Sequence, residues 1–223
     1  RIVDLQVIDH DFLQGQGDAR SVRHIPIPAH RGMIIDRNGE PLAVSTPVDT
    51  VWADPRKLAQ HPQEFARLAK ALDRDKNWLA RRVTSNLDRE FVYLVRHMRP
   101  ADAAKVKALG ISGVDTLREY RRYYPAGEVT GHLLGFTNVD DVGQEGLELA
   151  FDQWLGGEPG IKRVMRDREG RTIEDIERIK APRPGQDLRT SIDLRVQYLA
   201  YRALKQAVQE NSAHGGSVVV LDI

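Results

Sequence analysis

The sequence of 223 residues contains no cysteine. Disulfide bonds, thiolate zinc sites and cysteine nucleophiles are therefore excluded. A chain without thiols suits an oxidising compartment, although cytosolic proteins also lack cysteine in some cases. Composition thus narrows the chemistry available to this protein without fixing where it works.

Net charge and long apolar runs are also scarce. Lys+Arg 33 against Asp+Glu 32 gives a formal charge of +1, so no chain-wide positive field would attract nucleic acid or anionic lipid. Apolar runs are short, far below the roughly 20 residues that a membrane-spanning helix needs. The mixture of 41% hydrophobic and 29% charged residues is that of a globular protein of one or two domains.

The first part of the chain favours extended structure. Residues 1–30 alternate loosely and contain glycine and proline, which predicts edge strands and loops. Asn38-Gly39 lies between two apolar stretches, and this dipeptide is the strongest short-range signal for a β-hairpin because both positions accept positive φ cheaply.

Residues 55–110 read as a small α+β insert with its own core. Asp54-Pro55 predicts a helix start. Apolar residues at helical spacing predict three helices, and Phe91–Val95 reads as a buried strand. The apolar positions behind the helices are Phe65, Leu68, Ala69, Leu72, Trp78, Leu79 and Val83, with a last helix from Pro100 to Leu109 that ends at Gly110.

From Tyr120 to about Asp175 the pattern predicts strand and turn followed by a helix. Its apolar face would consist of Leu147, Phe151, Trp154 and Leu155. A tight turn is expected at residues 168–171 between two strands, and Pro182, Pro184 and Gly185 indicate a boundary.

The last forty residues resemble the beginning of another domain. Asp193 is placed to cap an amphipathic helix, whose stripe is Val196, Leu199, Ala200, Ala203, Leu204, Ala207 and Val208. Ser217–Ile223 predicts a buried strand, which one helix cannot cover. With a first residue that is Arg1 and not Met, this predicts a piece of a longer protein.

No catalytic motif is present. The 7 histidines are scattered without metal-ligand spacing, and Asp140-Asp141 lacks the oxygen ligands of a calcium loop. Glu145 and Glu148 lie one helical turn apart, which favours the start of a helix or pairing with arginine over acid–base chemistry. No serine begins Ser-x-x-Lys, and Lys-Thr-Gly is absent. The residues alone therefore predict a binding or scaffold module with no catalytic residue, metal or cofactor.

Four stretches together resemble class B penicillin-binding proteins. The first is Arg31-Gly32-x-x-x-Asp36-Arg37-Asn38-Gly39-x-x-Leu42-Ala43, the second Arg121-Arg122-Tyr123-Tyr124-Pro125-x-Gly127, and the third Gly143-x-x-Gly146-x-Glu148. The fourth, Leu188-x-x-Ser191-Ile192-Asp193-x-x-x-Gln197, resembles the entry into the transpeptidase domain. Glu128–Thr130 and Gly135–Asp140 are most similar to the division-specific member of Gram-negative bacteria.

This resemblance implies an α+β fold: an elongated pedestal of hairpins and extended strands with a small head, followed by the first helix and strand of a transpeptidase domain. The pedestal would comprise residues 1–54 and 111–183, the head 55–110, and the truncated transpeptidase domain 184–223. The parent would be a serine-type peptidoglycan D,D-transpeptidase of the septum, whose catalytic motifs lie beyond Ile223.

The resemblance also implies a location and partners. The parent would be periplasmic and tethered to the inner membrane by an N-terminal helix absent from this chain. The pedestal would hold its own transpeptidase domain away from the membrane and contact divisome membrane proteins, including the septal glycan polymerase. No nucleic acid is expected. The uncovered final strand predicts that the chain either becomes disordered after about Asn211 or self-associates through this strand.

The expected structural residues come from the boxes. The asparagine and glycine at the turn of the first box are expected to serve turn geometry. Arg31, Arg122 and Glu148 are expected to form one partly buried ion-pair network, against the alternative of independent surface charges. The complete set is Arg31, Gly32, Asp36, Arg37, Asn38, Gly39, Arg122, Pro125, Gly127, Gly143, Gly146 and Glu148.

Two other readings stay open from the residues. One is an enzyme that acts alone, such as a metal- or carboxylate-dependent hydrolase, and it predicts turnover by this chain. The other is a stand-alone periplasmic interaction module with no catalytic half.

Overall fold

The computed structural model describes residues 22–166 and 172–221. The chain divides into two compact units. The first contains Pro47–Tyr120 and Pro159–Arg183 together with the segment that ends at Pro28, and the second contains Ala29–Thr46, Arg121–Glu158 and the segment that begins at Pro184. The expected division into pedestal, head and transpeptidase start stays a prediction.

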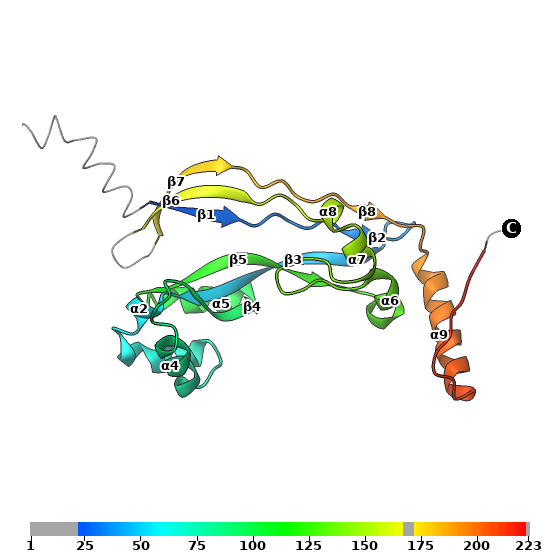
Figure 1. Cartoon of the computed structure of the whole chain (residues 1–223), viewed down its shortest axis with the longest axis horizontal. Helices are drawn as coiled ribbons and strands as arrows, with labels where there is room; N and C mark the ends of the chain where they lie inside the picture. Colours follow the sequence, from blue (N-terminus) through cyan, green and yellow to red (C-terminus); the bar gives the residue numbers. More distant parts are fainter. Residues whose placement is uncertain (1–21, 167–171, 222–223) are drawn as a thin grey trace, which may run out of the picture. The chain divides into compact units, whose positions relative to one another are not determined.

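One part of the first unit is a three-stranded antiparallel sheet in the order β1-β6-β7. Its strands are β1 (Val22–Ile27), β6 (Gly160–Arg166) and β7 (Thr172–Lys180). The predicted edge strand before residue 30 is therefore present as β1, paired only with β6 in the described chain (Figure 1). Residues 1–21 and the tight turn expected at residues 168–171 lie outside the described residues.

The other part of the first unit is a helical head on a sheet. The second half of β3 (Pro41–Ala53) pairs with β4 (Val92–Met98). The helices are α2 (Pro55–Leu58), η2 (Pro62–Glu64), α3 (Phe65–Ala71), α4 (Lys76–Thr84) and α5 (Pro100–Ala108). Asp54 and Asp75 cap α2 and α4 by accepting backbone N–H bonds. The helix start predicted at Asp54-Pro55 is confirmed, and the helices predicted around residues 65–72, 78–83 and 100–109 are present as α3, α4 and α5.

The structure differs from the expected head in two respects. Phe91 precedes β4 and is 41% exposed, with its ring stacked on that of Trp52, so the predicted buried strand at Phe91–Val95 is wrong at its first residue. The head core also includes Val51, Ala53 and Ile111, which lie outside 55–110, because β3 supplies the sheet on which the helices pack.

The second unit begins with the predicted hairpin. β2 (Ile34–Ile35) pairs antiparallel with the first half of β3 and parallel with β8 (Leu188–Arg189). Only Gly39 of the turn has positive φ (+92°), so Asn38 does not need the left-handed conformation that the sequence pattern suggested for both residues.

Short helices and a long strand complete the middle of the second unit. The last three residues of β5 (Val114–Tyr123), among them Arg122, belong to the second unit, and η3 (Gly127–Val129) and α6 (Gly131–Leu134) follow. The single helix expected around residues 147–155 is wrong: the chain forms α7 (Gly146–Ala150) and α8 (Asp152–Leu155) with a break at Phe151. Phe151 and Trp154 are exposed, and only Leu155 of the expected apolar face is fully buried, in a core with Ile34, Leu42, Ala43 and Leu134.

The second unit ends with α9 (Leu194–Glu210), capped by Asp193 as predicted. None of its residues is buried, although all of them are described. The strand predicted at Ser217–Ile223 is not formed within the described chain, because residues 217–221 have no regular secondary structure and Val219 is 78% exposed. Apart from this strand, the mixed α+β class is as expected.

Candidate functional site

Three sequence boxes meet at one carboxylate in the second unit. Glu148 lies in the first turn of α7, and its side chain is completely buried. Nε of Arg31 donates to its Oε2 over 2.9 Å, and Nε of Arg122 donates to its Oε1 over 2.7 Å. The predicted contact of these three side chains is present, and their burial excludes the alternative of independent surface charges.

The other N–H groups of Arg31 donate hydrogen bonds to three segments. Its Nη2 donates to the carbonyl oxygen of Glu148. Its Nη1 donates to the carbonyl oxygen of Asp141 and to Oδ1 of Asp152, over 3.0 Å and 2.7 Å. The same Oδ1 accepts the backbone N–H of Gly143. One guanidinium thus joins the loop before α7 to α7 and α8.

Arg122 connects the same carboxylate to the hairpin. Its Nη1 donates to the carbonyl oxygen of Gly32 over 2.8 Å and to Oγ of Ser45 over 3.0 Å. Its Nη2 is buried and has no hydrogen-bond partner among the residues that the structure describes. Because guanidinium groups present their donors in a rigid plane, these bonds fix orientation as well as distance.

Burial and pairing oppose each other in the electrostatics of this cluster. Burial acts to lower the pKa of Arg31, but its hydrogen bonds and charge interactions with Asp152 and Glu148 outweigh it, and the pKa rises. Burial raises the pKa of Asp141 to about 6, although Arg31 and Arg122 act to lower it. Arg31 therefore stays charged, whereas the pKa of Asp141 lies well above the ordinary value of a carboxyl group.

Glycines permit the close approach of the segments around the cluster. A Cβ on Gly32 would lie 2.0 Å from the carbonyl oxygen of Gln186, and one on Gly143 would lie 2.1 Å from that of Glu148. Gly32 thus serves backbone packing. Gly146 and Gly127 have positive φ, +58° and +52°, which favours glycine.

The hairpin turn is attached to the start of α9. Asp36 is 1% exposed and accepts the backbone N–H groups of Asn38, Glu40 and Leu194. The backbone N–H of Arg37 donates to the carbonyl oxygen of Ile192 over 2.8 Å. Burial acts to raise the pKa of Asp36, but hydrogen bonds from Glu40, Leu194 and Asn38 outweigh it and hold the pKa below its usual range.

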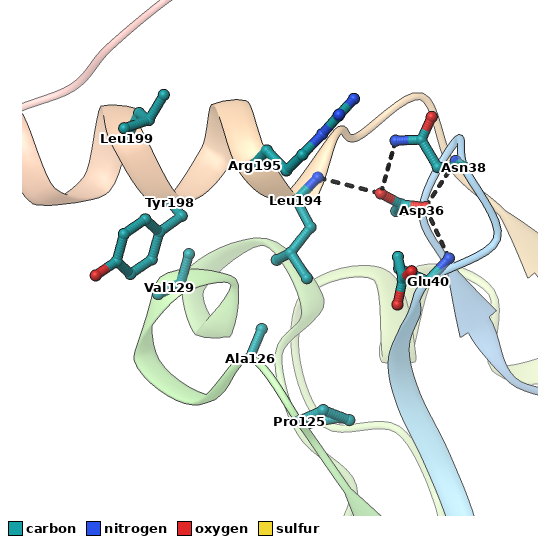
Figure 2. Close-up of a pocket in the computed structure, with 10 residues that line it drawn as sticks. All are labelled: Asp36, Asn38, Glu40, Pro125, Ala126, Val129, Leu194, Arg195, Tyr198 and Leu199. Atoms are coloured by element: carbon teal, nitrogen blue, oxygen red, sulfur yellow. Dashed lines mark hydrogen bonds between the residues drawn. The ribbon is translucent and has the colours of Figure 1, made fainter.

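A groove of about 910 Å³ lies along the first turns of α9 (Figure 2). Leu194 and Tyr198 project from α9 toward the segment that carries Pro125, Ala126 and Val129. Asp36, Asn38, Glu40, Arg195 and Leu199 complete the lining. The carboxylate of the buried Asp36 already accepts hydrogen bonds from the turn, from Asn38 and from Leu194, so it is not available to a partner. The surface that the groove presents is therefore mainly apolar.

Sequence reasoning missed three members of the cluster. Asp152 lies four residues after Glu148, a spacing that places two side chains on one helix face, and this signal was available. Ser45 and Asp141 carry no comparable signal, because their contacts join segments far apart in the chain. In contrast, the sequence boxes identified four charged residues that the structure buries with their partners: Arg31, Asp36, Arg122 and Glu148.

The charged side chains of the cluster bond to groups within the chain itself. Within residues 22–166 and 172–221, no group of three His, Asp or Glu side chains could hold a metal ion. In the same ranges no helix is long and apolar enough to cross a membrane. The buried charges bond to one another and to backbone carbonyls, which suits a rigid connection between segments.

Comparison with known proteins supplies the family. A family model described as the penicillin-binding protein dimerisation domain matches residues 26–190. The chain is 48% identical to a probable peptidoglycan D,D-transpeptidase, PbpC, of Pseudomonas aeruginosa and 45% identical to the peptidoglycan D,D-transpeptidase FtsI of Escherichia coli K12. Each match covers 100% of this chain and 39% of the relative, so the chain spans about two fifths of the length of these relatives.

Solved structures agree on the fold. A complex between Penicillin-Binding Protein (PBP2) and MreC from Helicobacter pylori matches with a TM-score of 0.65 and 21% identity over 83% of this chain and 38% of that chain. Penicillin Binding Protein 2X from Streptococcus thermophilus matches with a TM-score of 0.59 and 20% identity over 84% and 32%. The α+β class and the resemblance to class B penicillin-binding proteins are confirmed, and the chain belongs to the penicillin-binding protein dimerisation domain family.

Proposed function

We propose that this chain is the non-catalytic pedestal of a septal peptidoglycan D,D-transpeptidase and positions its catalytic domain during cell division. The observation that carries the proposal is the buried Arg31–Glu148–Arg122 cluster. Its three side chains are at most 3% exposed, so they are not available to a substrate. They join the hairpin, β5 and α7, which suits a part that transmits position rather than one that performs chemistry.

The chemistry belongs to sequence outside this chain. The chain contains no Ser-x-x-Lys, Ser-x-Asn or Lys-Thr-Gly, and an acyl-transferring serine needs an adjacent base. The relatives that it matches along its whole length are D,D-transpeptidases more than twice as long. The apolar groove along α9 offers the parent's own transpeptidase domain a surface to cover.

The proposal extends to the location and the partners of the parent protein. The proposed parent works in the periplasm, tethered to the inner membrane by an N-terminal helix. Its pedestal contacts divisome membrane proteins, among them the septal glycan polymerase. Support comes from the exposed Leu87 and Phe91 on the head, which are 45% and 41% exposed, and from the solved PBP2, whose complex contains MreC.

Labelling with a fluorescent penicillin tests whether the reactive serine lies outside this chain. The 223-residue chain should acquire no covalent label, whereas the parent protein should acquire one label per molecule. A stable adduct on Ser191 or Ser217 of the chain would overturn the proposal.

A second experiment separates the pedestal role from an unrelated structural role. In the parent, Glu148→Ala should impair septum formation in cells that depend on that copy, while penicillin labelling of the purified protein persists. Normal division with a destabilised pedestal would argue against the positioning role. Intact mass of the natural product tests the alternative of a stand-alone interaction module, which predicts about 25 kDa.

A further inference from the structure

Asp141 adds a third carboxylate to the buried cluster. Arg31 and Arg122 are already balanced by Glu148 and by Asp152, which bonds Nη1 of Arg31. Oδ1 of Asp141 is buried and accepts no hydrogen bond from any part of the chain that the structure describes. An ionised Asp141 would therefore be an excess buried negative charge whose inner oxygen lacks a donor.

The charged groups that face Asp141 come from four other segments. Arg31 and His30 precede β2, Arg122 lies on β5, and Glu148 lies on α7. Asp152, on α8, shares Nη1 of Arg31 with the Asp141 carbonyl oxygen. Burial is the largest influence and raises the pKa of Asp141 to about 6, while Arg31, Arg122 and His30 act to lower it and Glu148 to raise it.

The backbone of Asp141 ties its side chain to a loop. Asp141 has a φ of +62°, a left-handed conformation that non-glycine residues rarely adopt. The loop from Asn138 to Val142 is closed by the N–H of Asn138 on the carbonyl oxygen of Val142 and by two backbone N–H bonds to Oδ1 of Asn138. The Asp141 carbonyl oxygen accepts from Arg31, so turning the residue outward would break that bond.

We propose that Asp141 is a pH-sensitive latch: its neutral carboxyl group holds the loop 138–142 against the Arg31–Glu148–Arg122 cluster, and loss of its proton releases the loop. The proton is transferred to solvent. The ionised side chain then turns outward, and water solvates its charge. Release of the loop breaks the hydrogen bond between Nη1 of Arg31 and the carbonyl oxygen of Asp141. The latch is a property of the module itself and does not depend on the pedestal role.

Hydrogen exchange of the 223-residue chain tests the latch. The protection factor of loop amides, already corrected for intrinsic exchange, should fall about tenfold between about pH 5 and pH 7.5, since the open and closed loops differ by about two units in the pKa of one group. Amides of α9 serve as an internal reference and should show no such fall.

Three variants make the result specific. Asp141→Asn keeps a neutral group of the same shape, so its loop protection should not change with pH. Asp140→Asn, at the neighbouring position, should retain the fall. His30→Gln should retain it as well, and this control is needed because histidine ordinarily changes charge in this range. Equal protection of the wild-type loop at both pH values would overturn the latch, and so would a fall that persists in Asp141→Asn or disappears in His30→Gln.

A direct titration keeps the proposal testable if Asp141→Asn does not fold. The side-chain carboxyl carbon of wild-type Asp141, followed by nuclear magnetic resonance, should titrate with a midpoint of about 6, and the loop amides should shift with the same midpoint. A midpoint near the ordinary value of 3.8, or loop amides that do not follow the carboxyl group, would overturn it.

Discussion

Nε of Arg122 lies 2.7 Å from Oε1 of Glu148, with both side chains almost completely shielded from solvent. Arg122 lies near the end of β5 and Glu148 in the first turn of α7, 26 residues further along the chain. The other oxygen of the same carboxylate pairs with Arg31, 117 residues away in sequence. One carboxylate therefore connects three segments, and its removal would leave two buried cations without their shared partner.

Glu148→Ala should destabilise the second unit by about 3–5 kcal/mol, because removing one member of a buried ion pair leaves uncompensated charge. Urea unfolding followed by the fluorescence of Trp154, the tryptophan of this unit, measures the loss. Glu128→Ala in the same unit and Glu64→Ala in the first unit are surface controls, because both carboxylates form exposed pairs, and they should unfold close to the wild type.

A double-mutant cycle with Arg122→Met and Glu148→Gln tests whether the pair is coupled. The interaction energy should exceed about 1 kcal/mol, since contacting residues of one network do not contribute additively. Coupling near zero would mean that the two side chains stabilise the module independently, and the network would have to be abandoned.

Gly32→Ala should destabilise the second unit by about 3 kcal/mol or more, because the new methyl group would meet the backbone of Gln186 and not a movable side chain. Gly131→Ala is the matched control, since a Cβ at this position meets nothing within 4 Å. Alanine at the start of α6 also reduces the conformational entropy of the unfolded chain. Its stability should equal or slightly exceed that of the wild type. Equal unfolding midpoints for both variants would show that the segments can move apart without cost.

Local features were predictable from the sequence because local chemistry controls them. The hairpin at Asn38-Gly39 and the caps at Asp54 and Asp193 follow from turn and capping preferences within four residues. The grouping of Arg31 with Glu148 did not follow from spacing and required resemblance to a family. Contacts across more than a hundred residues leave no local periodicity.

The errors have physical causes of the same kind. Phe91 is apolar but stacks on Trp52 at the surface, and an apolar run alone does not say which face is covered. The helix expected through Phe151 is interrupted there, and the Oδ1 of Asp152 after the break bonds Arg31 and Gly143. Tertiary bonds of this kind override helix propensity.

Acid should weaken the attachment of the hairpin turn. The pKa of Asp36 lies below its ordinary value of 3.8 in the folded chain, so its contribution to stability is present above that value and is lost as pH falls through the folded pKa. The free energy of unfolding should therefore drop from about pH 5 to pH 3, and the drop should be smaller in Asp36→Asn. Glu40→Gln, at the exposed end of the same turn, should keep the full drop. An identical drop in Asp36→Asn would assign the acid sensitivity to other carboxylates.

The 223-residue chain should self-associate through residues 218–221. Val218, Val219, Val220 and Leu221 are 48%, 78%, 66% and 80% exposed, and their backbone has no regular pairing in the described structure. An extended aliphatic segment with free backbone groups pairs readily with another copy of itself. Sedimentation velocity should show a concentration-dependent increase in mass that Val219→Asp combined with Leu221→Asp removes. Val139→Asp, at a 49% exposed aliphatic site elsewhere in the same unit, should leave association unchanged. A wild-type chain that stays monomeric at all concentrations, with amides of 218–221 protected from exchange, would contradict this expectation and place the segment against its own unit.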